Sequence, residues 1–142
     1  MRKQEVNTGS TPDSSTLKRN SLLFWFALLT PVAIIPLGIN FLLNPVGASA
    51  AFGIPITDPA AFPFLWTKGI RDIFSGLVML PFFYRGDRRS LAVMYAAATM
   101  IPIGDGLVIL NRLGFAPPIY MHWGTALYMA IVTICLFRKK SL

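Results

Sequence analysis

Four long apolar blocks dominate this chain of 142 residues, and they limit what it can fold into. We place them at residues 21–43, 64–84, 90–110 and 117–137. A helix of about 20 apolar residues crosses roughly 30 Å of hydrocarbon and satisfies its own backbone hydrogen bonds. The alternation of apolar and polar residues that a membrane β-barrel requires is missing. The sequence therefore predicts an all-α, polytopic membrane protein with four transmembrane helices.

The distribution of basic residues predicts the orientation of these helices. Of the 13 Lys and Arg residues, ten lie before the first block, between the second and third blocks, or after the fourth. They are Arg2, Lys3, Lys18, Arg19, Arg85, Arg88, Arg89, Arg138, Lys139 and Lys140. The positive-inside rule then places both termini in the cytosol, an N-in/C-in topology. Residues 1–20 are expected to form a disordered cytosolic tail, and residues 138–142 a basic cytosolic terminus. The net charge of +7 is thus explained by topology, and we do not expect nucleic-acid binding.

The first connection, residues 45–63, is the longest and contains no basic residue, so it is expected on the outer or lumenal side. Its length and its apolar Phe52, Ile54 and Ile56 suggest that it folds back over the membrane surface. Either a simple interfacial loop or a lid fits this pattern. Prolines are expected to distort two of the helices. Pro31 should kink the first block, and Pro102 should loosen the third.

Ionisable residues inside the blocks are the main functional signal. Lys68, Arg71 and Asp72 lie in the second block, Asp105 in the third, and the single histidine, His122, in the fourth. Each charged group at the centre of a membrane helix costs roughly 2.5–3.5 kcal/mol. At 1.5 Å per residue, all five groups lie about 6–12 Å below the outer ends of their helices. They are therefore expected to share one layer of the membrane.

Within this layer, Lys68 and Asp72 are four residues apart and share one helical face, beside Arg71. Asp105 is expected to meet Arg71 or Lys68 across the bundle, so that two cations balance two anions. Two interpretations stay open. The four residues form either a structural lock that fixes helix register, or a lock combined with a small-molecule site.

If the layer is a site, it is suited to acid/base chemistry. Asp72, Asp105 and His122 are the candidate catalytic residues, with Lys68 and Arg71 stabilising charge. We expect no cofactor and no metal, because the chain lacks a phosphate-binding glycine loop, a nucleophile elbow and metal-ligand spacing. Cyclisation, isomerisation, or epoxide or lactone opening of a lipophilic small molecule would fit such a site.

Aromatic residues near the ends of the blocks have two readings. Trp66 and Trp123, with Tyr120, either form an aromatic belt at the outer interface or line a lipophilic pocket that binds substrate. Tyr84 and Tyr95 are expected to anchor the cytosolic interface in the same way.

The last residues resemble a targeting signal. Lys139 and Lys140 form a dilysine pattern typical of retrieval to the endoplasmic reticulum, or they are simply stop-transfer lysines. The expected location is the endoplasmic reticulum in a eukaryote and the plasma membrane in a bacterium.

Three segments together resemble a known family. Lys-Gly-Ile-Arg-Asp-Ile-Phe-Ser-Gly-Leu at 68–77, Pro-Ile-Gly-Asp-Gly at 102–106 and His-Trp-Gly at 122–124 are similar to DUF4267, a family of small four-helix membrane proteins that are DoxX-like in character. The resemblance covers residues 21–137 and implies a membrane domain with functional positions at Arg71, Asp72 and Asp105. Fungal members often occur among genes for secondary metabolism, which implies secondary-metabolite biosynthesis without supplying a reaction. The alternatives are a non-catalytic scaffold or accessory subunit for other membrane enzymes, or a small carrier, with a homo-oligomer also considered.

Overall fold

The computed structural model describes residues 16–138. Over this range the chain is helical, with no β-strand, as the sequence predicts. The elements are α1 (Leu22–Leu43), α2 (Pro45–Phe52), the 3-10 turn η1 (Pro59–Ala61), α3 (Phe62–Arg85), α4 (Arg88–Ala98), α5 (Met100–Leu113) and α6 (Pro118–Phe137). The lysines at 139 and 140 and most of the predicted tail lie outside the described residues.

Among the described residues, three helical segments are long and apolar enough to cross a membrane, namely α1, the combined α4–α5 segment Arg88–Leu113, and α6. The fourth long helix, α3, has 24 residues but carries Lys68, Arg71 and Asp72 near its middle. Large apolar side chains cover the outer faces of the helices, and such faces are suited to lipid contact. These features define a multi-pass membrane protein.

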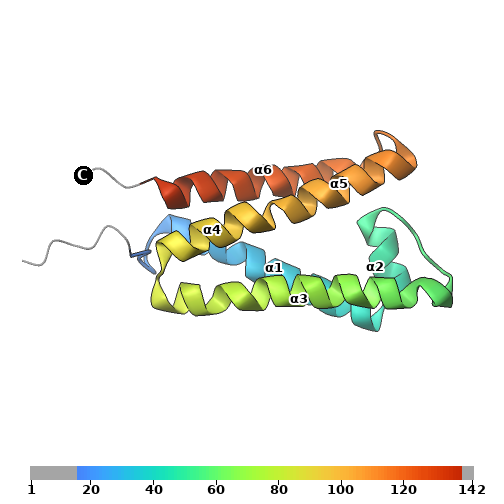
Figure 1. Ribbon diagram of the computed structural model, residues 1–142, viewed down its shortest axis with the longest axis horizontal. Helices are drawn as coiled ribbons and strands as arrows, with labels where there is room; N and C mark the ends of the chain where they lie inside the picture. Colours follow the sequence, from blue (N-terminus) through green and yellow to red (C-terminus); the bar gives the residue numbers. More distant parts are fainter. Residues whose placement is uncertain (1–15, 139–142) are drawn as a thin grey trace, which may run out of the picture.

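The long helices form two pairs (Figure 1): α1 packs along α3, and the α4–α5 segment packs along α6. Glycines bring α1 and α3 close together. A Cβ added at Gly38 would lie 2.5 Å from the Gly69 carbonyl oxygen, and one at Gly69 would lie 2.6 Å from the Gly38 carbonyl oxygen. Because no other residue fits at this distance, the α1–α3 pair is fixed by backbone contact.

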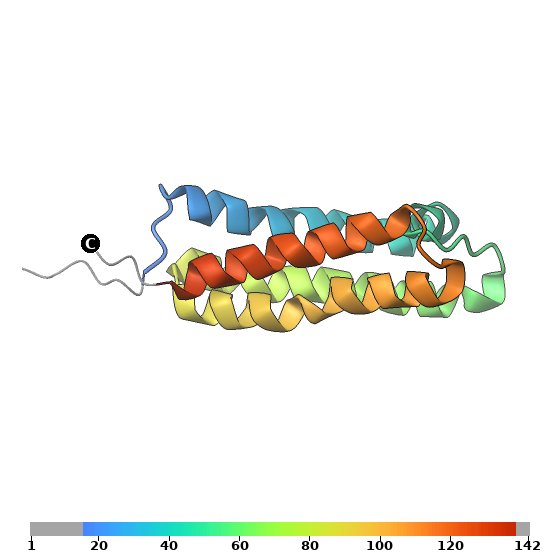
Figure 2. The same cartoon turned by 90° about the horizontal axis from the view of Figure 1, so that it is seen from above.

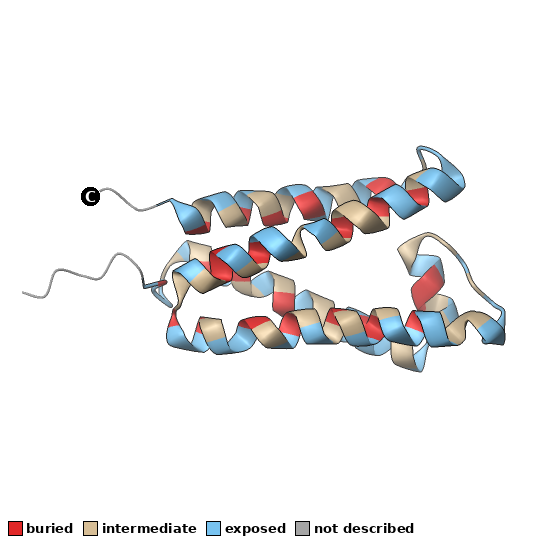
Figure 3. Cartoon of the chain, in the orientation of Figure 1, coloured by how far each residue is buried: buried red, intermediate tan, exposed pale blue. Residues whose placement is uncertain are grey.

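One end of the bundle is closed by a packed core, and the two pairs separate toward the other end (Figure 1). Figure 3 shows buried residues along the facing sides of the helices. The core at the closed end is Leu17, Phe24, Ala27, Met79, Phe83, Leu91, Ala92, Tyr95, Met129, Val132 and Leu136. The two ends of the described chain lie at this closed end (Figure 2).

Tyr95 joins the two pairs inside this core. Pro31 has no backbone N–H, so the Ala27 carbonyl one turn earlier in α1 lacks its helical donor. The Tyr95 hydroxyl of α4 donates a hydrogen bond to that carbonyl, and the Tyr95 side chain is fully buried. The expectation that Tyr95 anchors the membrane interface is therefore wrong. The hydroxyl finds its partner inside the bundle because a proline has freed one there.

The third apolar block is broken rather than uniform. Helix α4 ends at Ala98, and α5 begins at Met100. Pro102 accounts for the break, because its ring clashes with the carbonyl of the residue four positions earlier, which is Ala98. By contrast, α1 is one continuous helix through Pro31.

The first connection contains a helix that the sequence analysis did not predict. Asn44 begins α2 by accepting a hydrogen bond from the Gly47 N–H at 3.1 Å, and Pro45 occupies the first turn. Gly53, with a φ of 109°, ends the helix. The segment that follows is held back on α2, because the Ile56 N–H donates to the buried Ser49 hydroxyl at 3.0 Å. The predicted fold-back of this connection thus takes the form of a packed short helix.

We expect Tyr95→Phe to destabilise the protein, because the Ala27 carbonyl would lose the hydroxyl that replaces its missing helical donor in a buried site. The loss should be roughly 0.6–1.7 kcal/mol, the range for hydrogen bonds between membrane helices. Unfolding of the purified protein in detergent measures it, with the exposed Tyr120→Phe as the matched control. In a Pro31→Ala background, position 31 again has an N–H for Ala27, so the Tyr95→Phe penalty should shrink. An unchanged penalty there would refute this account of the contact.

Stability should also depend on Asp87, which caps α4 outside the apolar segments. Its oxygens accept hydrogen bonds from the Ser90 hydroxyl at 2.6 Å and the Ser90 N–H at 3.0 Å. The Ser90 hydroxyl bond is the main cause that lowers the pKa of Asp87 below its ordinary 3.8. A group with a lowered pKa in the folded state stabilises it above its ordinary pKa, and this contribution disappears as the pH falls below that value.

The expected result is that Asp87→Asn keeps the cap but loses this part of the acid sensitivity. Unfolding midpoints of wild type and Asp87→Asn, followed from about pH 5 downward, provide the measurement. Ser90→Ala should give a weaker acid dependence than wild type. Equal slopes for wild type and Asp87→Asn would count against the assignment.

Candidate functional site

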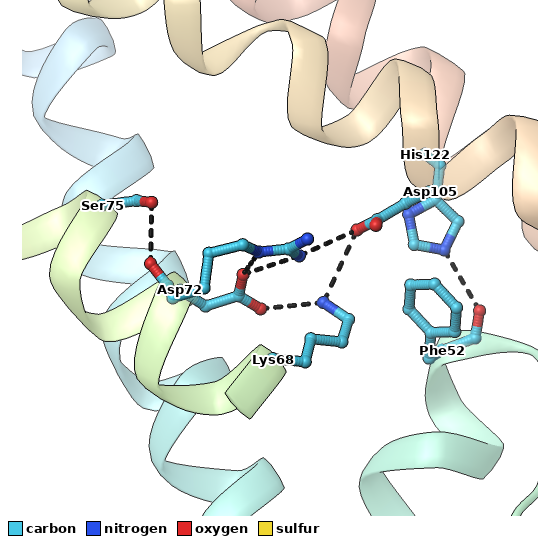
Figure 4. A network of polar contacts seen from close by, with 7 residues as sticks. Phe52, Lys68, Asp72, Ser75, Asp105 and His122 are labelled. Carbon is cyan, nitrogen blue, oxygen red and sulfur yellow. Dashed lines mark hydrogen bonds and ion pairs between the residues drawn. The ribbon is translucent and has the colours of Figure 1, made fainter. Parts of the chain in front are cut away.

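Four charged side chains meet between the two helix pairs, and we name them the ionic quartet: Lys68, Arg71, Asp72 and Asp105 (Figure 4). Lys68 Nζ lies 2.8 Å from Asp72 Oδ2 and 3.5 Å from Asp105 Oδ2. Arg71 Nη2 lies 3.0 Å from Asp72 Oδ1 and 3.4 Å from Asp105 Oδ2. Each cation therefore contacts both anions, and the ion pair predicted between α3 and Asp105 forms with both basic residues.

The two aspartates differ in how tightly they are held. Asp72 is buried, and both of its oxygens accept short hydrogen bonds from Lys68 and Arg71. Asp105 reaches the cations only through Oδ2 and at longer distances. Within residues 16–138, Asp105 Oδ1 accepts no hydrogen bond, and its side chain is 16% exposed. Asp72 is thus committed to the cations, whereas Asp105 has a free oxygen.

Phe52 of α2 connects the ionic quartet to His122 of α6 (Figure 4). Lys68 Nζ lies 4.7 Å from the centre of the Phe41 ring and 4.8 Å from that of Phe52, a cation–π arrangement with both. The His122 ring lies 4.6 Å from the Phe52 ring, and its Nε2 is 3.1 Å from the Phe52 carbonyl oxygen. A carbonyl only accepts, so Nε2 donates to it, and Nδ1 of the uncharged imidazole is then an acceptor to which no described residue donates a hydrogen bond.

These residues lie at one end of a cavity of about 490 Å³, within the usual range for small-molecule sites. Helices α1 to α6 all contribute to its walls, which are mainly apolar, with Ala98 as the residue from α4. The α3 wall is one helical face, formed by Lys68, Asp72, Ser75 and Met79. The Ser75 hydroxyl donates to the Arg71 carbonyl at 2.7 Å, so it presents only acceptor capacity to the cavity.

The structure brings together five of the seven residues singled out from the sequence. Four form the ionic quartet, and His122 lines the same cavity. The two tryptophans are not part of the cavity wall. Trp66 is 43% exposed on the outside of α3, and the Trp123 indole packs against Gly106 between α5 and α6. Both tryptophans therefore lie outside the lining of this cavity, and their interfacial and substrate-binding readings stay predictions.

Sequence reasoning missed the contribution of Phe41, Phe52 and Ser75 to this site. The first two are ordinary apolar residues within apolar segments, and nothing in the sequence sets them apart. Asn44, Pro45 and Gly53 do carry the start and stop signals of a helix, and these signals could have placed α2. In the part of the chain that the structure describes, no three His, Cys, Asp or Glu side chains are grouped to hold a metal ion.

The fold and the site together define a small all-α membrane protein with a charge-neutral polar cluster at the end of an apolar cavity. The chain belongs to the family described as domain of unknown function DUF4267, whose model matches residues 32–136. All residues of the ionic quartet, His122 and α2 fall inside this match. A search of the curated proteins found no significant match, and neither did a search of the solved structures.

We expect Asp72→Asn to destabilise the protein more than Asp105→Asn, because it leaves two cations with one weakly bonded anion. Removing one member of a buried pair costs about 3–5 kcal/mol, and the 40% exposed Arg71 side chain places the effect at the low end or below. Adding Lys68→Met to Asp72→Asn restores neutrality and should recover part of the loss. Unfolding in detergent is the measurement, with Asp58→Asn, a carboxylate outside the cavity, as control. Wild-type stability for Asp72→Asn would contradict this expectation.

Proposed function

We propose that the protein crosses the membrane four times, with α3 as the fourth span and the closed end of the bundle in the cytosol. Asp105 neutralises part of the charge that sets α3 apart from the other long helices. The basic residues described at the closed end support the orientation. They are Lys18, Arg19, Arg85, Arg88, Arg89 and Arg138. The cavity, with α2 beside it, then lies in the outer or lumenal half.

We further propose that this cavity binds a lipophilic small molecule and moves a proton on it. The observation that carries the proposal is a pair of acceptor atoms at the end of an apolar cavity, Asp105 Oδ1 and His122 Nδ1, to which none of residues 16–138 donates a hydrogen bond. Groups of this type act as general acids and bases when they lie within reach of a substrate. Ionisable groups at membrane depth mark functional sites more often than not.

The two aspartates then have separate roles. Asp72 holds Lys68 and Arg71 in place, and it is occupied by hydrogen bonds that a substrate would have to break. Asp105 takes a proton from the substrate through its free oxygen, while the cations stabilise negative charge that develops nearby. Different environments for two carboxylates are the usual way to separate such roles.

Isomerisation or cyclisation suits this arrangement best. Asp105 or His122 removes a proton at one position, and the resulting acid returns a proton at another, so the overall proton count does not change. Opening of an epoxide or lactone would use the same two groups together with a water molecule. The apolar walls of the cavity strengthen the electrostatic effects on which each of these reactions depends.

The test is untargeted metabolite profiling of cells that express wild type, Asp105→Asn or Asp58→Asn. It compares which small molecules each variant converts. Asp105→Asn keeps the size and most of the hydrogen bonding but removes the carboxylate. We expect product to fall by about 10²-fold or more, the usual contribution of one acid/base group. Asp58→Asn makes the same chemical change at an exposed site and should leave product unchanged.

The same experiment separates the alternatives. Full product formation by Asp105→Asn, with normal protein level, would rule out the acid/base role of Asp105. The same result for His122→Gln would leave the scaffold or carrier reading. Loss of product only where the protein also disappears from the membrane would indicate a structural lock. The location in the endoplasmic reticulum and the link to secondary metabolism stay predictions, which fractionation and the identity of the product would test.

A further inference from the structure

We infer that the ligand of this cavity is an elongated, uncharged amphiphile whose polar end donates a hydrogen bond, such as a hydroxyl or an enol. It reaches the site from the bilayer, between α1 and α6. This inference rests on the proposed ligand-binding role of the cavity. It adds the charge, the polarity and the shape of the molecule.

The charge follows from the neutrality of the ionic quartet. Two cations face two carboxylates, and Lys68 and Arg71 each contact both of them. Among the described residues that line the cavity, Lys68 is the one lysine or arginine, and it already faces both carboxylates, while Arg71 lies outside the lining. A carboxylate or phosphate on the ligand would therefore enter an apolar cavity without a free partner, and an isolated buried charge is strongly unfavourable.

The hydrogen-bond polarity follows from the atoms that are still free. Asp105 Oδ1 and His122 Nδ1 are both acceptors, whereas the donors that Lys68 and His122 bring to this end of the cavity already face acceptors or rings. The Lys68 ammonium faces Asp72, Asp105 and two aromatic rings, and the His122 Nε2–H faces the Phe52 carbonyl. A ligand group that only accepts would leave these two atoms unsatisfied, whereas a donor satisfies one of them. Asn40, exposed at the same end, offers both a donor and an acceptor and does not discriminate.

The shape follows from the spacing of the wall residues. The α3 wall runs from Lys68 to Met79, which is 11 residues or about 16 Å of helix. Its charged members, Lys68 and Asp72, lie at one end, Ser75 follows with its hydroxyl bonded to the Arg71 carbonyl, and Met79 and Met129 form the apolar end. The one unpaired hydroxyl there, Thr30 Oγ1, is covered by neighbouring atoms and is not presented to the cavity. A linear tail attached to one polar group matches this gradient.

The access route follows from which wall residues are exposed. On α1 these are Leu29, Ala33, Leu37 and Asn40, on α6 they are Met121 and Thr125, and α2 adds Ala51. Leu29 and Leu37 are each 56% exposed, and Met121 is 54% exposed. The cavity therefore opens sideways, onto the surface that faces lipid, and a ligand dissolved in the bilayer can enter without crossing water.

The experiment measures displacement of a fluorescent apolar reporter from the full-length protein in nanodiscs, with the bilayer concentration of each competitor determined. Three competitors of similar length are used: dodecanol, dodecyl methyl ether and dodecanoate, at a pH where the carboxylate is ionised. The alcohol donates a hydrogen bond, the ether only accepts, and dodecanoate carries a negative charge. We expect the alcohol to bind about tenfold more tightly than the ether, and the carboxylate to bind most weakly.

Asp105→Asn should change the order in which the protein binds the three competitors in the same assay. It removes the anionic acceptor and leaves the remaining three charges with a net positive charge. Dodecanoate should then gain at least about tenfold, and the advantage of the alcohol over the ether should decline. Asp58→Asn, which alters an exposed carboxylate outside the cavity, should keep the wild-type order.

A second pair of variants tests whether the cavity binds the reporter at all. Ala98→Leu narrows the cavity, whereas Ala97→Leu adds the same side chain to the adjacent exposed position on α4. Reporter binding should fall for Ala98→Leu alone. Equal binding by both variants, without displacement by any competitor, would defeat the ligand site and with it the proposed function. If only Ala98→Leu loses the reporter, the ligand site stands. In that case, this inference would be overturned if dodecanoate bound wild type most tightly, or if the alcohol and the ether bound it equally.

Discussion

The charge balance of the ionic quartet is the constraint on which the rest of the structure depends. Helix α3 carries two cations and one anion, and Asp105 of α5 supplies the missing charge from the other helix pair. Without Asp105, α3 would bring a net charge into an apolar bundle, at a cost of several kcal/mol. The two pairs are therefore tied in one register at this depth, although their helices have separated. The ionic contacts hold the two pairs together at this depth, as close helix packing holds them together at the closed end.

The cavity results from these two kinds of connection. At the closed end, Tyr95 and the surrounding core pull the pairs together until apolar side chains interlock. At the other end, long ionic side chains hold them at a distance, with Phe52 of α2 placed between Lys68 and His122. Side chains that pack directly would fill the gap, whereas charged groups joined tip to tip leave space beside their stems. An internal volume at membrane depth thus follows from the same atoms that keep the charges neutral.

The sequence predicts those features that depend on local pattern and helical geometry. Block lengths predict the long helices, and the 1.5 Å rise places the five ionisable groups in one layer, where four now meet. Rotation about the helix axis is not predictable in the same way. Helix α1 is apolar all round, so its inward face is not marked, and the inward position of Tyr95 and the outward position of Trp66 follow only from packing. The short helix α2 was missed for a different reason: Asn44, Pro45 and Gly53 signal it, but its apolar length is too short to suggest a membrane span.

A structural lock and a binding site are usually opposed explanations for charges in a membrane, but in the function that we propose they apply to different members of one cluster. Asp72 is buried and bonded on both oxygens, which is what a lock requires. Asp105 sits beside the break between α4 and α5, is held by longer contacts, and keeps one oxygen free. A proton or ligand arriving at Asp105 can therefore alter one carboxylate while Asp72 still pairs both cations. Because Asp72 still pairs with both cations, Asp105 is able to take part in chemistry without separating the two helix pairs.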